Sequence, residues 1–210
     1  MIEIIRSQAR VLRSVLRRAM NLPARGPVEP QVFEAGQHGL TVRVVSGEFA
    51  AEYRIEGSRE TDTLVIPPSL LVDCEGRSKA VVQIETIGSG RIASQWSDGN
   101  VPQLCSYDPA GEVPAFPDVP AKFVELEPRF ATAYVAACSV REPDPARFAI
   151  DHVLLRGKAG EVAGTDGKQI YIEKGFDFPF SDDVLVPASG VFSCSDLKHK
   201  GPIDMAKTDD

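Results

Sequence analysis

The spacing of apolar and polar residues at the start of the chain predicts a short strand followed by an amphipathic helix. Residues 1–6 are expected to form the strand, and Ser7 the N-cap of a helix that continues to about Met20. One face of that helix consists of Leu12, Val15, Leu16 and Ala19, and the opposite face of Arg10, Arg13 and Arg17. An arginine face is typical of a solvated surface helix and also of a helix that faces phosphate. The spacing leaves both interpretations open.

Turn residues and period-two alternation then predict a series of short strands. In the first half of the chain these are residues 32–35, 40–45, 50–55, 64–66, 81–87, 91–96 and 102–106, followed by a proline-rich linker at 108–120. The second half repeats the order, with strands at 122–126, 148–156, 161–164, 169–173 and 184–186, the start of another at 203–205, and a helix from Pro128 through Ala137.

The chain contains one stretch twice, at an offset of 120 residues. Residues 62–74 and 182–194 share an Asp, an aliphatic run, a Pro, a Ser and a Cys at matching positions. Each copy predicts a buried strand that ends at proline and turns into a helix capped by Ser69 or Ser189. Two copies predict an α+β fold of duplicated units, each an antiparallel sheet with helices on one face. We expect domain 1 at residues 1–118 and domain 2 at 119–210, the second incomplete at its C-terminus.

Composition limits the classes of function. The net charge is −7, yet residues 1–25 carry six arginines against Glu3, a local +5 that leaves −12 on the remainder. This balance argues against indiscriminate nucleic-acid binding and allows a local basic face. The sequence has neither an 18-residue apolar span nor a signal peptide, so we expect no membrane association. The four cysteines are widely spaced, with Cys74 and Cys194 at equivalent repeat positions, which favours buried core residues and a reducing cytoplasm.

Motifs for catalysis and cofactors are weak. Residues 88–93 match a dinucleotide-binding glycine pattern, but the turn at 97–100 leaves no room for the required helix, so a hairpin is favoured. Residues 164–168 lack the first glycine and the Ser or Thr of a phosphate loop. Adjacent Asp151 and His152 should point to opposite faces of a strand, which disfavours a hydrolase that uses them. We expect no enzyme activity, no metal and no cofactor.

Residues 147–190 resemble the middle domain of the bacterial sliding clamp, the β subunit of DNA polymerase III. The resemblance rests on the stretch 147–155, on the turn Thr165-Asp166-Gly167 with its flanking residues 161–170, and on the strand end 184–187. The first copy then resembles the clamp's N-terminal domain, and Phe116-Pro117 its inter-domain segment. Clamps have three domains, so the resemblance implies a chain that stops inside the second.

The resemblance implies a ring-forming homo-oligomer that encircles duplex DNA and tethers DNA polymerase to it. Basic residues facing the hole would contact phosphate without reading sequence. The expected DNA-binding residues are Arg10, Arg13, Arg17, Arg18, Arg25, Arg77, Lys79, Lys198 and Lys200. The helix from Pro128 has one arginine, Arg129, and its orientation toward DNA stays open.

The resemblance also implies a pocket for short extended peptides of the polymerase and the clamp loader. Its residues here would be Ile150, Thr165, Gly167, Lys168, Gln169 and Ile170. The alternative for this segment is a plain hairpin turn, to which these residue types are well suited. For the whole chain, the alternative is a clamp-fold protein-interaction module that does not encircle DNA.

Overall fold

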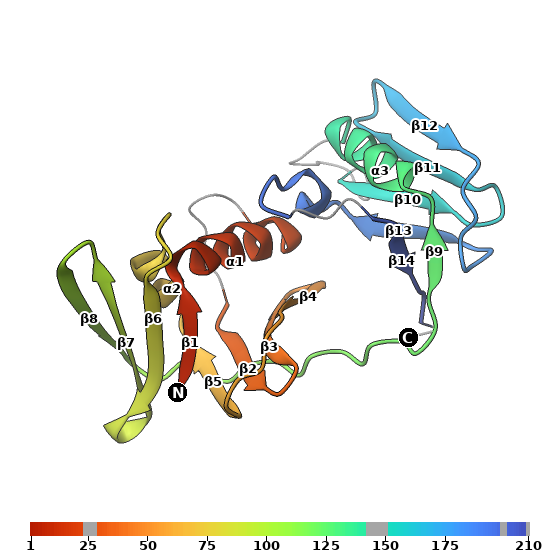
Figure 1. Cartoon of the computed structure of the whole chain (residues 1–210). Coiled ribbons are helices and arrows are strands. Elements are labelled where there is room, and N and C mark those ends of the chain that lie inside the picture. Colours follow the sequence, from red (N-terminus) through yellow and green to blue (C-terminus); the bar gives the residue numbers. More distant parts are fainter. Residues whose placement is uncertain (23–28, 142–150, 198–200, 209–210) are drawn as a thin grey trace. The chain divides into compact units, whose positions relative to one another are not determined.

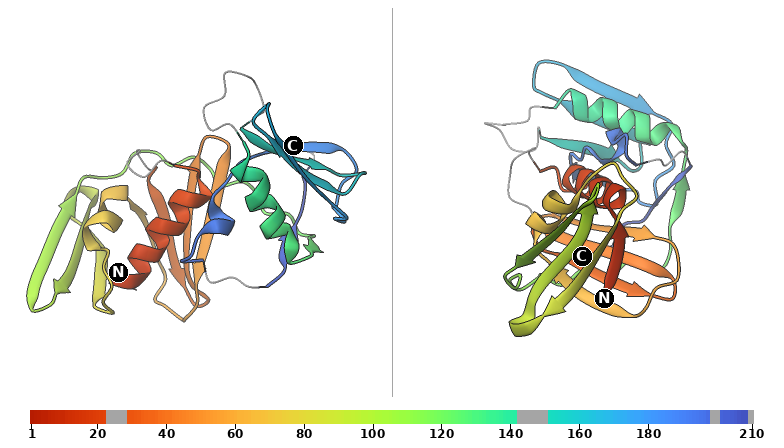
Figure 2. Two further views of the ribbon diagram at one scale, coloured as in Figure 1. Left: turned by 90° about the horizontal axis from the view of Figure 1, so that it is seen from above. Right: turned by 60° about the vertical axis from the view of Figure 1, so that its left-hand side comes forward.

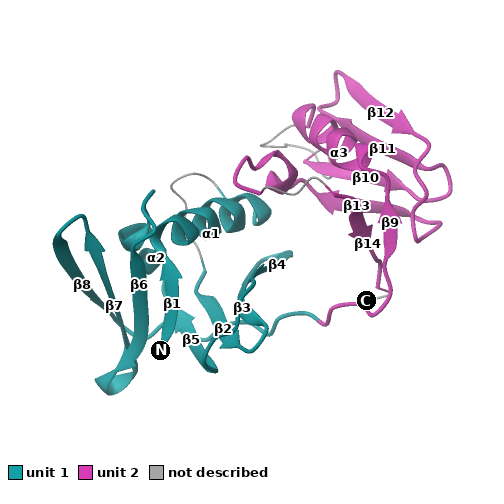
Figure 3. Ribbon diagram, viewed as in Figure 1, with its two compact units in different colours: residues 1–117 teal, residues 118–210 magenta. Residues whose placement is uncertain are grey.

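The computed structural model describes residues 1–22, 29–141, 151–197 and 201–208 (Figure 1). The chain divides into two compact units, Met1–Pro117 and Asp118–Asp210 (Figure 3). Each unit is described by itself.

Unit 1 contains two helices and two antiparallel four-stranded sheets among its described residues. In chain order the elements are β1 (Ile2–Ile5), α1 (Arg6–Ala19), β2 (Gln31–Gly36), β3 (Gly39–Ser46), β4 (Phe49–Ile55), β5 (Asp62–Ile66), α2 (Pro68–Cys74), β6 (Val81–Ile87), the 3-10 turn η1 (Gly88–Gly90), β7 (Arg91–Asp98) and β8 (Val101–Tyr107). The strand orders are β1-β6-β7-β8 and β4-β3-β2-β5. The glycine pattern at 88–93 therefore belongs to the connection between β6 and β7, as predicted, and does not precede a helix.

The core of unit 1 lies between the helices and the sheets. The predicted apolar face of α1 is buried at Leu12, Val15 and Leu16, and α1 lies across one face of the β4-β3-β2-β5 sheet (Figure 2). Leu12 and Leu16 belong to the same buried cluster as Phe33, which is fully buried. The helix is thus held by its apolar face, and its arginine face is turned away from the core.

Both predicted serine caps in unit 1 are wrong. Helix α1 begins one residue before Ser7, with Ile5 at the N-cap position, because the Gln8 side chain accepts a hydrogen bond from the Ile5 N–H at 3.0 Å. Helix α2 begins at Pro68, ahead of Ser69. Proline has no N–H that needs a partner in the first turn, so it can begin the helix without a side-chain cap.

Unit 2 repeats the order of unit 1. Its elements are β9 (Val124–Leu126), α3 (Arg129–Ser139), β10 (His152–Arg156), β11 (Glu161–Thr165), β12 (Ile170–Lys174), β13 (Asp183–Pro187), the 3-10 turn η2 (Val191–Ser193) and β14 (Ile203–Met205). The strand orders β12-β11-β10-β13 and β14-β9 correspond to β4-β3-β2-β5 and β6-β1. Leu126 opposite Ile203 repeats the pair of Ile4 and Val82. The predicted α+β fold of duplicated units is confirmed.

The repeated block does not form the same structure twice. The first copy forms the α-helix α2, whereas the second forms only the short turn η2, so the helix predicted after Ser189 is wrong. Gly190 stands where the first copy has Leu70, and glycine costs about 1 kcal/mol in a helix. The Ser189 hydroxyl also accepts a hydrogen bond from the Val191 N–H at 3.3 Å, a local bond that competes with helix formation. The cysteines that end the blocks, Cys74 and Cys194, are both buried, as predicted, and neither forms a disulfide within the described residues.

Candidate nucleic-acid and partner interfaces

The basic face of α1 is only partly available to a ligand. Arg10 and Arg18 are exposed, whereas Arg13 and Arg17 are partly buried. Arg13 forms an ion pair with Glu75 at 2.6 Å, and both side chains are about one third exposed. The guanidinium of Arg13 therefore joins α1 to the end of α2 and is already partly neutralised. The sequence placed it beside Arg10 and Arg17 correctly but could not show this long-range partner.

Arg6 holds the two helices of unit 1 together, a role that sequence analysis missed. Its guanidinium donates to the carbonyl oxygens of Cys74 at 3.2 Å and Glu75 at 3.1 Å, and it forms an ion pair with Asp98 at 2.5 Å. These contacts satisfy carbonyl groups at the C-terminal end of α2, where a cation is favoured. The available signal was the position of Arg6 four residues before Arg10, on the same helical face.

The basic residues after α2 extend this surface. Arg77 and Lys79 follow the helix and are exposed. Of the other predicted DNA-binding residues, Arg25, Lys198 and Lys200 lie outside the described residues. The structure thus describes six of the nine predicted residues, all in unit 1: Arg10, Arg13, Arg17, Arg18, Arg77 and Lys79. The four exposed members of this group, here called the basic surface, are Arg10, Arg18, Arg77 and Lys79.

Helix α3 differs from α1 in charge. Arg129 is its one charged residue. The Arg129 guanidinium lies 4.3 Å from the centre of the Phe176 ring and donates to the carbonyl oxygens of Lys174 at 2.9 Å and Gly175 at 2.5 Å. It also pairs with Glu127 at 2.6 Å. Arg129 therefore connects the start of α3 to the loop after β12. Its guanidinium is thus directed toward residues of unit 2.

Five of the six predicted peptide-binding residues, Thr165, Gly167, Lys168, Gln169 and Ile170, lie in or beside one tight turn between β11 and β12. The Asp166 carboxylate accepts hydrogen bonds from the N–H groups of Lys168 and Gln169, both at 2.8 Å, and these bonds lower the pKa of Asp166. The Thr165 hydroxyl donates to the Gln169 carbonyl at 2.7 Å. Gly167 has a φ of +84°, which favours glycine. The segment is thus a hairpin turn with internally satisfied bonds.

The same turn presents an apolar side chain beside it. Lys168 and Gln169 are exposed, and the Ile170 side chain that follows is 66% exposed. An exposed isoleucine next to a fixed turn is compatible with a contact for a partner's apolar side chain, so the two interpretations of this segment do not exclude each other. Ile150, the remaining predicted residue, lies outside the part of the chain that the structure describes.

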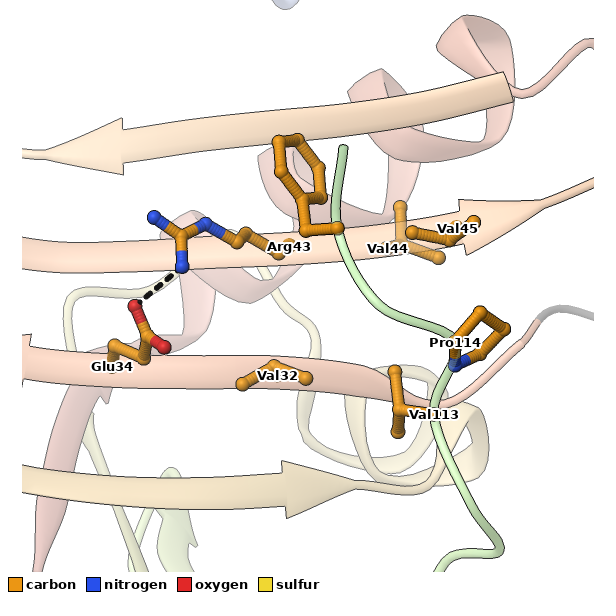
Figure 4. A pocket seen from close by; sticks show the side chains of 8 residues that line it. Val32, Glu34, Arg43, Val44, Val45, Val113 and Pro114 are labelled. Carbon is orange, nitrogen blue, oxygen red and sulfur yellow. Dashed lines mark hydrogen bonds and ion pairs between the residues drawn. The ribbon is translucent and has the colours of Figure 1, made fainter. Parts of the chain in front are cut away.

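Unit 1 has a cavity on the face of the β4-β3-β2-β5 sheet opposite α1, here called the helix-free face. Its volume is about 160 Å³, and its lining consists of Val32, Glu34, Arg43, Val44, Val45, Val113, Pro114 and Phe116 (Figure 4). The predicted linker is therefore not a free spacer, because residues 113–116 pack on β2 and β3. The Arg43 guanidinium lies 5.3 Å from the centre of the Phe116 ring.

Asp151 and His152 contact each other, so the prediction that they point to opposite faces is wrong. The His152 Nδ1 lies 2.5 Å from the Asp151 carboxylate, and this hydrogen bond lowers the pKa of Asp151. The reason is that β10 begins at His152, which leaves Asp151 in a turn where side chains need not alternate. Across the described ranges, no group of three or more His, Cys, Asp or Glu side chains could hold a metal ion beside this pair or elsewhere.

The helices seen in the described segments are all too short or too polar to cross a membrane.

Comparison with known proteins identifies the fold. No family model and no curated protein matches the sequence. Among solved structures, the DNA polymerase sliding clamp of Bacillus subtilis matches with a TM-score of 0.72 at 14% identity, over 99% of this chain and 59% of the clamp chain. The DNA polymerase III β subunit of Pseudomonas aeruginosa matches with a TM-score of 0.67 at 14% identity, over 97% and 58%.

A third similar structure was solved with a peptide. The Helicobacter pylori β clamp bound to a DNA ligase peptide matches with a TM-score of 0.67 at 15% identity, over 95% of this chain and 58% of the other. The chain thus spans about three fifths of the length of these clamps, which it resembles along nearly its whole length. The fold is that of bacterial sliding clamps, and the resemblance noted in the sequence is confirmed at the level of the fold.

Proposed function

We propose that this chain, which has the fold of bacterial sliding clamps, is a non-enzymatic processivity factor or part of one. It would tether DNA polymerase by encircling duplex DNA in the cytoplasm, without a cofactor. The observation that carries the proposal is the fold match over 99% of the chain to the Bacillus subtilis clamp, joined to a basic surface on the first helix pair. A topological tether needs only weak, sequence-independent contacts, so the DNA can slide.

The basic surface supports the DNA part of the proposal. Arg10 and Arg18 on α1 and Arg77 and Lys79 after α2 are exposed in a unit whose core holds both helices firmly. Their charge is concentrated within a chain of net charge −7, so phosphate would be attracted here and repelled elsewhere. Arg13 and Arg17 would add to the local potential, and Arg25, Lys198 and Lys200 remain predicted contacts.

Strand β8 supports assembly into a ring. It lies at the edge of the β1-β6-β7-β8 sheet, and its Val101 and Leu104 side chains are 58% and 73% exposed. An edge strand has unpaired backbone groups that can form a ladder with a strand of another chain, and exposed apolar side chains stabilise such a contact. The number of subunits follows from the geometry of that contact.

The turn at Thr165–Ile170 supports a peptide partner. Gly167, Lys168, Gln169 and Ile170 are exposed on a turn whose shape is fixed by Asp166, so a partner peptide would meet a pre-formed surface. We propose that segments of DNA polymerase and of the clamp loader bind there, together with Ile150. The similarity to a clamp solved with a DNA ligase peptide is consistent with this class of partner.

Retention on circular DNA tests the tether directly. Labelled protein is bound to nicked circular duplex at low salt, the salt is raised to about 0.5 M to screen phosphate contacts, and the circle is then linearised. We expect retention on the circle and loss after linearisation, because an encircling ring can leave only over an end. Equal loss from circular and linear DNA would contradict encirclement.

The second candidate is a clamp-fold interaction module that does not encircle DNA. The observation that favours it is α3, whose one charged residue, Arg129, is engaged by Glu127 and by backbone carbonyl groups within unit 2. A ring that slides on DNA benefits from basic helices in every unit. Binding of partner peptides without retention on circular DNA would establish this second function.

A further inference from the structure

The helix-free face of unit 2, opposite α3, has an exposed apolar row across its middle. Strand pairing places Ile172, Ala163, Leu154 and Leu185 side by side across β12, β11, β10 and β13. Ile172 is 47% exposed and Leu185 is 45% exposed, with Leu154 partly buried between them. Ala163 is small and is buried at 7% exposure, so the row is lowest at its second position and its exposed area lies mainly at Ile172 and Leu185.

The corresponding row in unit 1 is charged. The repeated blocks align Val65 with Leu185, and strand pairing then aligns the remaining positions. Leu154, Ala163 and Ile172 in unit 2 correspond to Val32, Arg43 and Glu52 in unit 1. Arg43 and Glu52 form an ion pair at 2.7 Å. Unit 2 thus has an alanine and an isoleucine where unit 1 has an ion pair.

Unit 1 shows what a face of this topology binds. Residues 113–116 lie by its β2 and β3, where Val113 and Pro114 line the same cavity as Val32 and Arg43 (Figure 4). The Phe116 ring also lines it and lies next to the Arg43 guanidinium. The segment has no regular secondary structure and belongs to the stretch after β8. The chain itself therefore provides the example of an occupant: an extended segment with an aliphatic residue, a proline and an aromatic residue.

The charged side chains in the row beside the apolar row of unit 2 already pair with one another. Glu161 pairs with Arg156 at 2.9 Å and with Lys174 at 2.7 Å, and Arg156 also lies 3.5 Å from Asp183. Two acidic and two basic groups neutralise each other along this row. The neighbouring apolar row then favours a neutral segment, because a charge placed on it would lose water without gaining a partner.

We propose that the helix-free face of unit 2 binds an extended segment of a partner protein that carries an aliphatic residue, a proline and an aromatic residue. The segment lies across β10 and β11, over Leu154 and Ala163, with Ile172 and Leu185 at its two sides. The inference rests on the proposed function only in taking the partner to be a peptide segment. Its location rests on strand register and on the duplicate in unit 1. Ile170 precedes Ile172 by two residues on β12, so the row borders the Thr165–Ile170 turn on the same face of the sheet.

The test uses the chain's own segment as a peptide added in trans. The probe is the acetylated, amidated peptide of residues 113–117, which carries no charge, and the control peptide is the same peptide with Val113→Ser and Phe116→Ser. Binding to the isotope-labelled full chain is followed by amide chemical shifts. The face in unit 1 is already occupied by the attached segment at high effective concentration, so we expect shifts in β10 and β11.

Charge substitutions on the row distinguish this site from others. We expect Ile172→Glu and Leu185→Glu each to weaken binding of the probe at least ten-fold, and the control peptide to bind at least ten-fold more weakly. Thr132→Glu, which adds the same charge at an exposed position of α3, should leave binding unchanged. Thermal unfolding checks that each variant is folded, and Ile172→Ser replaces Ile172→Glu if that variant is not.

Several outcomes would overturn the inference. These are no binding of the probe up to its solubility limit, shifts confined to unit 1, or loss of binding by Ile170→Glu alone, which would leave only the turn as a peptide site. A concentration-dependent dimer that Ile172→Glu dissociates, with no peptide binding, would show that a second copy covers the face. Retention on circular DNA does not depend on this row, so failure here and failure of the tether are separate results.

Discussion

The two units have the same strand order and different surfaces. Helix α1 has five arginines, whereas α3 has Arg129 alone. The sheet faces differ in the same direction, since unit 1 has the charged pair Arg43 and Glu52 where unit 2 has the apolar Ala163 and Ile172. The strand pairing matches, as the pairs Ile4–Val82 and Leu126–Ile203 show, although Ile203 is only partly buried. A duplicated core can therefore carry one surface suited to phosphate and another suited to apolar protein segments.

The largest expected effect comes from opening either core. Phe33 in unit 1 and Phe130 in unit 2 are buried at 0% and 2% exposure. Phe33→Ala and Phe130→Ala should each lower the free energy of unfolding of their own unit by about 3–5 kcal/mol, because a large cavity remains. Denaturant unfolding followed by residue-specific signals from each unit measures this, with exposed Ile172→Ala as the control. Equal destabilisation of both units by either variant would show that the cores are not independent.

A smaller effect is expected at the first residues of α1 and α3. Arg6 and Arg129 both donate to backbone carbonyl groups of a neighbouring element. Arg6→Ala should cost about 2 kcal/mol, since the side chain is 11% exposed, and Arg129→Ala should cost less, since that side chain is 40% exposed. The same unfolding experiment applies, with Arg10→Ala as the matched helix-surface control. If Arg10→Ala cost as much as Arg6→Ala, the helix-fastening role of Arg6 would be disproved.

The contrast in helix charge predicts a contrast in DNA binding. The double variant Arg10→Glu with Arg18→Glu should weaken binding to a short duplex about ten-fold or more and reduce the salt slope by about 2. Lys158→Glu, an exposed charge reversal in unit 2, should change neither quantity. Fluorescence anisotropy over a series of salt concentrations gives both numbers. Equal effects of the two variants would indicate diffuse charge rather than a defined basic surface.

The smallest expected effect concerns the turn in unit 2. Backbone N–H groups of Gln169 and Lys168 lower the pKa of Asp166, so ionised Asp166 stabilises the turn at neutral pH. This stabilisation is fully present above the ordinary aspartate pKa of about 3.9 and is lost as the pH falls below that value, through the lowered pKa in the fold. Amide exchange at residues 167–169 should therefore rise below about pH 4 relative to other turns. Asp166→Asn should remove this pH dependence, and persistence in the variant would assign it to another group.

Sequence predicted the order of strands and the duplication, because alternation, prolines and the repeated block are local signals. The helix N-caps were predicted wrongly, because α1 begins with a hydrogen bond to the Gln8 side chain and α2 begins at Pro68 instead of being capped by the expected serines. The helix predicted in the second copy of the repeated block does not form, because Gly190 and the hydroxyl of Ser189 oppose it. The roles of Arg6, Arg13 and Arg129 depend on partners far away in the sequence. The contrast between Arg43 and Ala163 needs strand register, which only the folded units supply.

We propose that DNA contacts unit 1 at α1, whereas unit 2 binds proteins. Amide and arginine side-chain chemical shifts of the labelled chain, recorded during titration with a 20-base-pair duplex of mixed sequence, test it most directly. The account predicts shifts at Arg10, Arg18, Arg77 and Lys79 that diminish as salt increases, with α3 unchanged. Shifts centred on α3 or on the helix-free face of unit 2, with α1 unchanged, would contradict it.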